Sequence, residues 1–167
     1  MEIPKSVNRI LFVCYGNLCR SVLADAIMRR LRAGRGLEHI EVASAGTGAL
    51  PDYPAPHPVV EAARDHGLDV TGHRSQHLNS SLFDWADIIL VMESYMRDEI
   101  ELVWPEKNPD KIFLLSSFAP GNTSTGDIDD PYGGPPEGFQ RCFEEIETSV
   151  QGLLEALMSE NALTPEE

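Results

Sequence analysis

Short apolar runs alternate with amphipathic stretches along this chain. The runs at 9–14 (RILFVC) and 87–92 (DIILVM) are rich in β-branched residues and apolar at every position after the first. That pattern predicts strands that are buried on both faces. Weaker runs at 41–44 and 111–115 predict two further strands. The sequence therefore predicts four strands, the first of them close to the N-terminus.

Apolar residues spaced three or four positions apart predict helices that begin near residues 20, 58, 94 and 136. Ser94 is expected to cap the third helix, and Pro105 is expected to end it. Residues 116–136 are rich in Pro, Gly and Asp and predict a long loop before the last helix. A loop of that length in a compact domain is usually either functional or disordered.

Strands that alternate with helices predict an α/β fold, in which helices cover both faces of one parallel sheet. We expect a doubly wound, flavodoxin-like sheet of four strands in the order 2-1-3-4. The 167 residues suffice for a single domain spanning 1–167. Ligands of such sheets bind beyond the carboxyl ends of the strands, and the first strand ends at Cys14.

The charge balance excludes one class of partner. Thirteen Lys and Arg against 27 Asp and Glu give a net charge of −14, whereas nucleic acids and anionic lipids attract basic surfaces. The sequence contains no run of about 18 apolar residues, so it predicts no membrane span. Three cysteines are too few for a disulfide framework, and no apolar leader precedes the first strand, so we expect a cytoplasmic protein.

The loop from Cys14 to Ser21 predicts an anion site. It joins a buried strand to a helix N-terminus, so that its backbone N–H groups and the helix dipole point to one place. Gly16 and Asn17 tolerate the left-handed backbone that such a loop needs, and Arg20 adds a guanidinium that matches two phosphate oxygens. The same donors stabilise a thiolate at Cys14, which would then be a nucleophile in place.

Hydrolysis of a phosphate ester also needs an acid for the leaving oxygen. Asp130 stands out because Pro131 stiffens the chain beside it, and Tyr132 is suited to wall a slot for an aromatic substrate. Asp127 and Asp129 lie on the same loop. On spacing alone, these two carboxylates remain equally available as the acid.

Four segments carry a resemblance to a known family: residues 13–21, 44–47, 87–92 and 130–132. They occur in the order and spacing of the low-molecular-weight protein tyrosine phosphatases, and the likeness runs from about residue 8 to 157. The resemblance implies hydrolysis of protein phosphotyrosine without a metal or cofactor, by a monomer or weak dimer. The loops resemble those of bacterial members, which often oppose a tyrosine autokinase in polysaccharide production or signalling.

The resemblance also implies roles for individual residues. Cys14 would form a cysteinyl-phosphate, Arg20 would bind the phosphoryl oxygens, and Asp130 would protonate the leaving phenol. The residues expected to contact the substrate are Tyr15, Gly16, Asn17, Leu18, Cys19, Ser21, Leu50 and Tyr132. Those expected to hold the loop in shape are Asn17, Ser21, Ser44 and His73, with Ser21 also bonded to the sulfur. Cys19 matches a neighbour that forms a reversible disulfide with Cys14.

Some positions depart from the family pattern. Val22 replaces a Pro at the first helical position, Leu50 stands where many members have an aromatic residue, and Gln76 replaces a basic residue. Related phosphoarginine phosphatases carry a Thr at the position of Leu18, whose apolar side chain favours an aryl phosphate.

Two other functions stay open. A thiol-dependent arsenate reductase shares this fold and loop but relays oxidation through two further cysteines on a mobile segment, and here only Cys19 and Cys142 remain. A non-catalytic phosphate-binding module would have no need of Cys14, Arg20 and Asp130 together.

Overall fold

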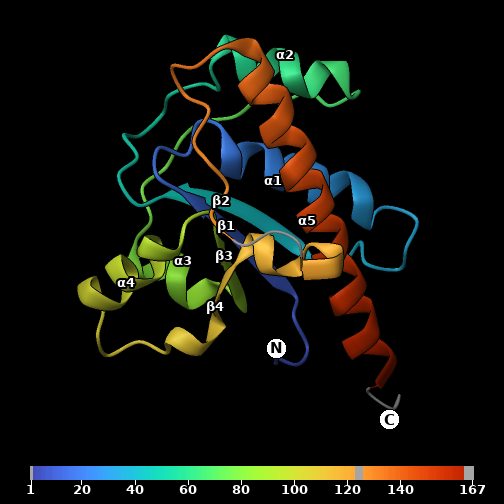
Figure 1. The fold of residues 1–167 in the computed structure, drawn as a ribbon. Helices are drawn as coiled ribbons and strands as arrows, with labels where there is room; N and C mark the ends of the chain where they lie inside the picture. Colours follow the sequence, from blue (N-terminus) through green and yellow to red (C-terminus); the bar gives the residue numbers. More distant parts are fainter. Residues whose placement is uncertain (1, 123–125, 164–167) are drawn as a thin grey trace.

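Four parallel strands form one sheet at the centre of the molecule (Figure 1). The computed structural model describes residues 2–122 and 126–163. The strands are β1 (Arg9–Cys14), β2 (Glu41–Gly46), β3 (Ile88–Val91) and β4 (Ile112–Leu114). Their order is β2-β1-β3-β4, so the predicted α/β class and strand order are confirmed.

In the described part of the chain, five α-helices surround the sheet: α1 (Arg20–Arg32), α2 (His57–Asp65), α3 (Ser80–Trp85), α4 (Ser94–Val103) and α5 (Pro136–Leu163). The long helix α5 packs against α1 and α2. These three helices lie on one side of the sheet, and α3 and α4 lie on the other (Figure 1). No helix in the described ranges combines the length and apolarity needed to cross a bilayer.

The structure differs from the sequence prediction in several places. The short helix α3 was not predicted, and β2 continues two residues further, to Gly46. Two 3-10 turns, Leu115–Phe118 and Pro120–Asn122, occupy part of the predicted loop 116–136, of which residues 123–125 lie outside the described part.

The prediction that Ser94 caps α4 was wrong. Ser94 is the first helical residue, and the capping position belongs to Glu93, whose side chain makes no capping bond. The carboxylate of Asp127 accepts the hydrogen bond from the Ser94 N–H instead, at 2.8 Å. A residue 33 positions away thus supplies the acceptor that sequence reasoning assigned to the serine.

The register of the sheet sets the position of the first loop. Cys14 pairs with Gly46 on β2, and Val13 pairs with Val91 on β3, so β1 ends between two strands. Every residue of β1 after Arg9 is buried. The loop that follows Cys14 therefore leaves a rigid apolar sheet at its carboxyl edge, where ligands of this class of fold bind.

Candidate active site

The chain between β1 and α1 forms a cradle of backbone N–H groups. Cys19 occupies the capping position of α1 without a side-chain capping bond, so the first N–H groups of the helix remain available to a ligand. Two backbone bonds fasten the cradle to the loop after β2: Thr47 N–H donates to Cys14 O at 3.0 Å, and Gly48 N–H donates to Tyr15 O at 2.9 Å.

Two glycines make this close approach possible. A Cβ at Gly46 would lie 2.4 Å from the carbonyl oxygen of Tyr15 and 2.8 Å from the Asn17 nitrogen. A Cβ at Gly48 would lie 2.5 Å from the ring of Tyr15. A side chain at Gly46 would therefore displace the backbone of the cradle, and a side chain at Gly48 would displace the ring of Tyr15.

The buried side chain of Asn17 fixes the shape of the cradle. Its amide nitrogen donates to Ser21 Oγ at 2.8 Å and to Ser44 Oγ at 3.0 Å. Its amide oxygen accepts from the Gln76 N–H at 2.9 Å, and its backbone oxygen lies 2.6 Å from His73 Nε2. Asn17 itself has φ of 52°, in the left-handed region. Such a backbone persists only when its surroundings over-determine it, as these four bonds do.

Ser21 connects this network to the sulfur. Its Oγ lies 3.0 Å from Cys14 Sγ. Because the Asn17 amide nitrogen can only donate, Ser21 Oγ accepts that bond and its own hydrogen is free for the sulfur. The Ser21 hydroxyl can therefore donate a hydrogen bond to Cys14 Sγ.

Arg20 is only 1% exposed, and its guanidinium is held on one side. Nη1 forms an ion pair with Glu93 and donates to the carbonyl oxygen of Ile128 at 2.8 Å. Burial opposes the charge, but Glu93, Cys14 and Asp130 outweigh it and raise the pKa of Arg20 above its ordinary value. Within the described residues, Nε of Arg20 is buried without a partner. The guanidinium therefore keeps an unused donor, as an arginine that binds an oxyanion requires.

The carboxylate of Asp130 borders the same space. Its Oδ2 lies 3.6 Å from Arg20 Nη2, and its Oδ1 accepts from the Tyr132 N–H at 3.1 Å. Its loop is anchored to the end of β3, because the N–H of buried Ile128 donates to Met92 O at 2.9 Å. The side chain of Asp130 remains 42% exposed, so it can exchange protons with solvent.

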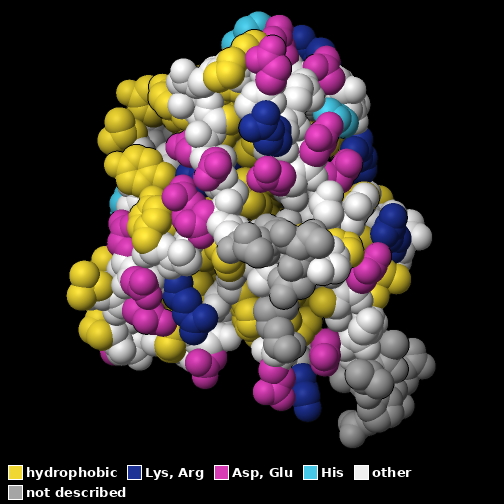
Figure 2. Space-filling view, viewed as in Figure 1, with side chains coloured by type: hydrophobic (Ala, Val, Ile, Leu, Met, Phe, Trp, Pro, Cys, Tyr) yellow, Lys and Arg dark blue, Asp and Glu magenta, His cyan; other side chains and the backbone are white. Residues whose placement is uncertain are grey.

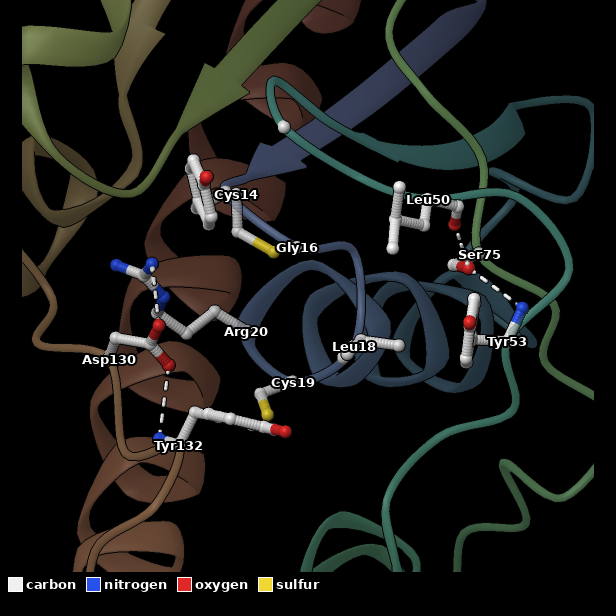
Figure 3. A pocket seen from close by; sticks show the side chains of 12 residues that line it. Cys14, Gly16, Leu18, Cys19, Arg20, Leu50, Tyr53, Ser75, Asp130 and Tyr132 are labelled. Atoms are coloured by element: carbon white, nitrogen blue, oxygen red, sulfur yellow. Dashed lines mark hydrogen bonds and ion pairs between the residues drawn. The ribbon is translucent and has the colours of Figure 1, made fainter.

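Cys14, Arg20 and Asp130 line a pocket of about 360 Å³ (Figure 3). Leu50 and Tyr53 lie on one side of it, and Asp130 and Tyr132 lie on the other. The hydroxyl of Ser75 is already used, because it donates to Leu50 O and accepts from Tyr53 N–H. The lining residues are Cys14, Tyr15, Gly16, Leu18, Cys19, Arg20, Gly48, Leu50, Tyr53, Ser75, Asp130 and Tyr132.

The structure divides the residues that were expected to contact the substrate. Asn17 and Ser21 are completely buried beneath the cradle and do not line the pocket, whereas the other six do. Ser44 and His73 lie behind the cradle, bonded to Asn17. The sequence analysis missed Tyr53, Ser75 and Glu93 as parts of the site. It noted Gln76 only as a departure, although the Gln76 side chain also donates to Ser44 O at 2.9 Å.

The other two cysteines are buried thiols. Cys14, Cys19 and Cys142 are all free and buried. Burial raises the pKa of the Cys142 thiol to about 12 and also raises the pKa of Cys19, so neither is a ready thiolate.

Among residues 2–122 and 126–163, no three His, Cys, Asp or Glu side chains are grouped as a metal site would require.

Comparison with known proteins agrees with this geometry. The family described as "Low molecular weight phosphotyrosine protein phosphatase" matches residues 9–163. The chain belongs to this family. It is therefore a phosphatase of the low-molecular-weight class, and the sequence resemblance is confirmed.

Individual relatives divide between two substrates. A probable low molecular weight protein-tyrosine-phosphatase, EpsP of Ralstonia nicotianae, is 39% identical over 86% of this chain and 92% of its own. The YwlE arginine phosphatase from Geobacillus stearothermophilus superimposes with a TM-score of 0.85 at 36% identity, covering 96% of this chain and 99% of its own. Vibrio vulnificus Wzb in complex with benzylphosphonate gives a TM-score of 0.81 at 32% identity, over 91% of this chain and 100% of its own.

Proposed function

We propose that this low-molecular-weight phosphatase hydrolyses phosphotyrosine in proteins, with Cys14 as nucleophile, Arg20 as oxyanion ligand and Asp130 as acid and base. The observation that carries the choice of substrate is the apolar wall of the pocket above the cradle.

In the first step, the Cys14 thiolate attacks phosphorus, so that an S–P bond forms as the bond from phosphorus to the phenolic oxygen breaks. The leaving oxygen takes a proton from Asp130. The N–H groups of the cradle and the free donor of Arg20 stabilise the charge that spreads over the phosphoryl oxygens. Glu93 holds the guanidinium in place during this step, because it pairs with Nη1 and leaves Nε free.

In the second step, water attacks the phosphorus of the cysteinyl-phosphate and gives a proton to Asp130. The S–P bond breaks, inorganic phosphate leaves and the thiolate returns. Asp130 must hold a proton when the substrate binds and lose it before water attacks. The exposed position of its side chain supports this exchange.

The pocket wall supports an aryl phosphate over phosphoarginine. A phenyl ring carries no polar hydrogen between its body and the phosphate, whereas a phosphoarginine guanidinium carries N–H donors that need acceptors when they leave water. Leu18, Leu50 and Tyr53 line the slot, and the oxygen of Ser75 is already bonded to the chain. Asp130 is the one carboxylate among the described residues that line the pocket, and it is needed as the acid.

Parallel kinetics on phosphotyrosine and phosphoarginine test this assignment. We expect the ratio of the two kcat/KM values to favour phosphotyrosine, and Leu18→Thr to shift the ratio toward phosphoarginine. A burst of nitrophenol from p-nitrophenyl phosphate would show the covalent intermediate, and Cys14→Ser should abolish turnover. Faster hydrolysis of phosphoarginine by the unaltered protein would contradict the proposal.

The physiological partner we propose is a phosphotyrosine protein such as a tyrosine autokinase, as the family resemblance implies.

A further inference from the structure

Exposed apolar and aromatic side chains surround the mouth of the pocket. Four large apolar or aromatic side chains of the pocket lining stay exposed: Tyr15 at 54%, Leu50 at 65%, Tyr53 at 53% and Tyr132 at 63%. Hydrophobic side chains gather at the upper left of Figure 2, where the loops after β1 and β2 lie in Figure 1. Exposed apolar patches of this kind mark surfaces that bind a partner.

A carboxylate stands among these side chains. Asp52 is exposed between Leu50 and Tyr53 in the sequence, and its backbone N–H is fastened to Ser75 O at 2.8 Å. The mouth thus carries a negative charge on the side that Leu50 and Tyr53 form.

The positive charge lies at the bottom of the pocket and is screened. Arg20 is the one Lys or Arg among the lining residues described, and it is buried and paired with Glu93. Arg74 is exposed next to Ser75 and is the cation nearest to the mouth along the chain. The cradle therefore attracts the phosphate, while the rim above it repels further anions.

We propose that this rim, formed by Leu50, Asp52, Tyr53 and Tyr132, binds the substrate polypeptide on either side of the phosphotyrosine and selects basic over acidic flanking residues. This inference rests on the proposed function. The aromatic and aliphatic side chains contact the chain and the long aliphatic stems of Lys or Arg. The Asp52 carboxylate attracts the charged ends of those side chains and raises the rate of productive encounter.

Phosphotyrosine peptides of equal length test the proposal, with flanking residues that are all Lys, all Gln or all Glu. We expect kcat/KM to fall from the Lys to the Gln to the Glu peptide. Exposed charge pairs change an affinity by about two- to fivefold each. The spread should shrink when salt is raised to about 0.5 M, because these charges lie in solvent.

Variants locate the effect. Asp52→Asn keeps a residue that tolerates the φ of 66° at this position, and it should bring the Lys and Glu peptides closer together. Glu155→Gln removes another exposed carboxylate, from α5, and should leave the ratio unchanged. Arg74→Gln should widen the preference for the Lys peptide.

The outcomes separate the two proposals. Equal kcat/KM for the three peptides, or a preference for the Glu peptide, overturns the role of the rim and leaves phosphotyrosine hydrolysis intact. Failure to hydrolyse any of the peptides, together with hydrolysis of phosphoarginine, overturns the proposed function itself. A Lys preference that Asp52→Asn and Glu155→Gln reduce equally reflects the net charge of the protein, and it also overturns the rim.

Discussion

The hydroxyl of Ser21 is the side-chain group that touches the sulfur of Cys14, at 3.0 Å. Its orientation is inherited from Asn17, whose amide is in turn fixed by Gln76. The nucleophile therefore depends on side chains that never meet the substrate. This dependence explains why the conformation of one buried asparagine matters to the chemistry.

Replacing Ser21 by Ala should slow turnover of p-nitrophenyl phosphate without unfolding the protein. The variant loses one hydrogen bond to a charged sulfur, which corresponds to a fall in kcat of about ten- to a hundredfold. Ser159→Ala removes a comparable hydroxyl from α5, where it bonds only Glu155 O, and serves as the control. A kcat equal to that of the control would show that Ser21 does not assist the thiolate.

Three carboxylates of one loop were candidates for the acid, and the structure separates them. Asp127 bonds the Ser94 N–H, Asp129 is not among the residues that line the pocket, and Asp130 lies 3.6 Å from Arg20. Asp130→Ala should slow the hydrolysis of phenyl phosphate far more than that of p-nitrophenyl phosphate, because nitrophenol leaves without a proton. General acids contribute about a hundred- to ten-thousandfold. Asp129→Ala should keep the ordinary dependence on the leaving group, and equal slowing of both substrates by Asp130→Ala would exclude it as the acid.

The strands were predictable from the sequence because burial on both faces leaves each of them an apolar run, as in β1 and β3. Helix α3 was not, because it has six residues and buries only Phe83, too little for a periodic pattern. Its Asn79 cap, which accepts from Leu82 N–H at 2.9 Å, was the one local signal available.

The residues of the candidate site likewise fall into those that were predictable from the sequence and those that were not. The cradle from Cys14 to Ser21 was predictable because its residues are contiguous. Glu93 and Gln76 reach it only through the fold, from 73 and 59 positions away in sequence. No spacing rule of a single sequence brings such residues together.

The contact between helix α4 and the loop of the acid leads to a prediction about Asp127. Its carboxylate caps α4 from outside the helix, and the next residue, Ile128, bonds both Met92 O and Arg20. Asp127→Ala should loosen the loop that carries Asp130, so kcat should fall more for poor leaving groups than for good ones. Loss of a cap costs about 1 kcal/mol, which corresponds to about 2–4 °C in Tm for a chain of this size.

Asp127→Asn is the matched variant for this test, because its amide oxygen still accepts from the Ser94 N–H. It should restore both the Tm and the leaving-group dependence. If Asp127→Ala lowers Tm but slows all substrates equally, the residue stabilises α4 alone and does not position the acid.

At the scale of the whole molecule, the imidazole of His73 connects the segment between α2 and α3 to the cradle. Its Nε2 is hydrogen-bonded to Asn17 O, 56 residues away in sequence. Burial lowers the pKa of His73 below its ordinary value of 6.5, against the opposing effect of the bond to Asn17. As the pH falls through about 6.5, the imidazole of His73 therefore takes up a proton in the unfolded chain, whereas in the folded protein it does so only at a lower pH. In that window the unfolded state holds more protons, so the free energy of unfolding contributed by His73 rises with pH and levels off above 6.5.

His73→Gln should remove this dependence, since glutamine offers an N–H to Asn17 but does not titrate. Urea unfolding of both proteins between about pH 5 and 8 measures it: the stability advantage of the unaltered protein over the variant should grow as pH rises to 6.5 and stay constant beyond. His57→Gln, at the exposed start of α2, controls for the loss of a histidine that does not touch the cradle. An advantage that shrinks as pH rises would mean that the folded protein prefers the charged imidazole, and the cradle would then be held by a cation rather than by a neutral donor.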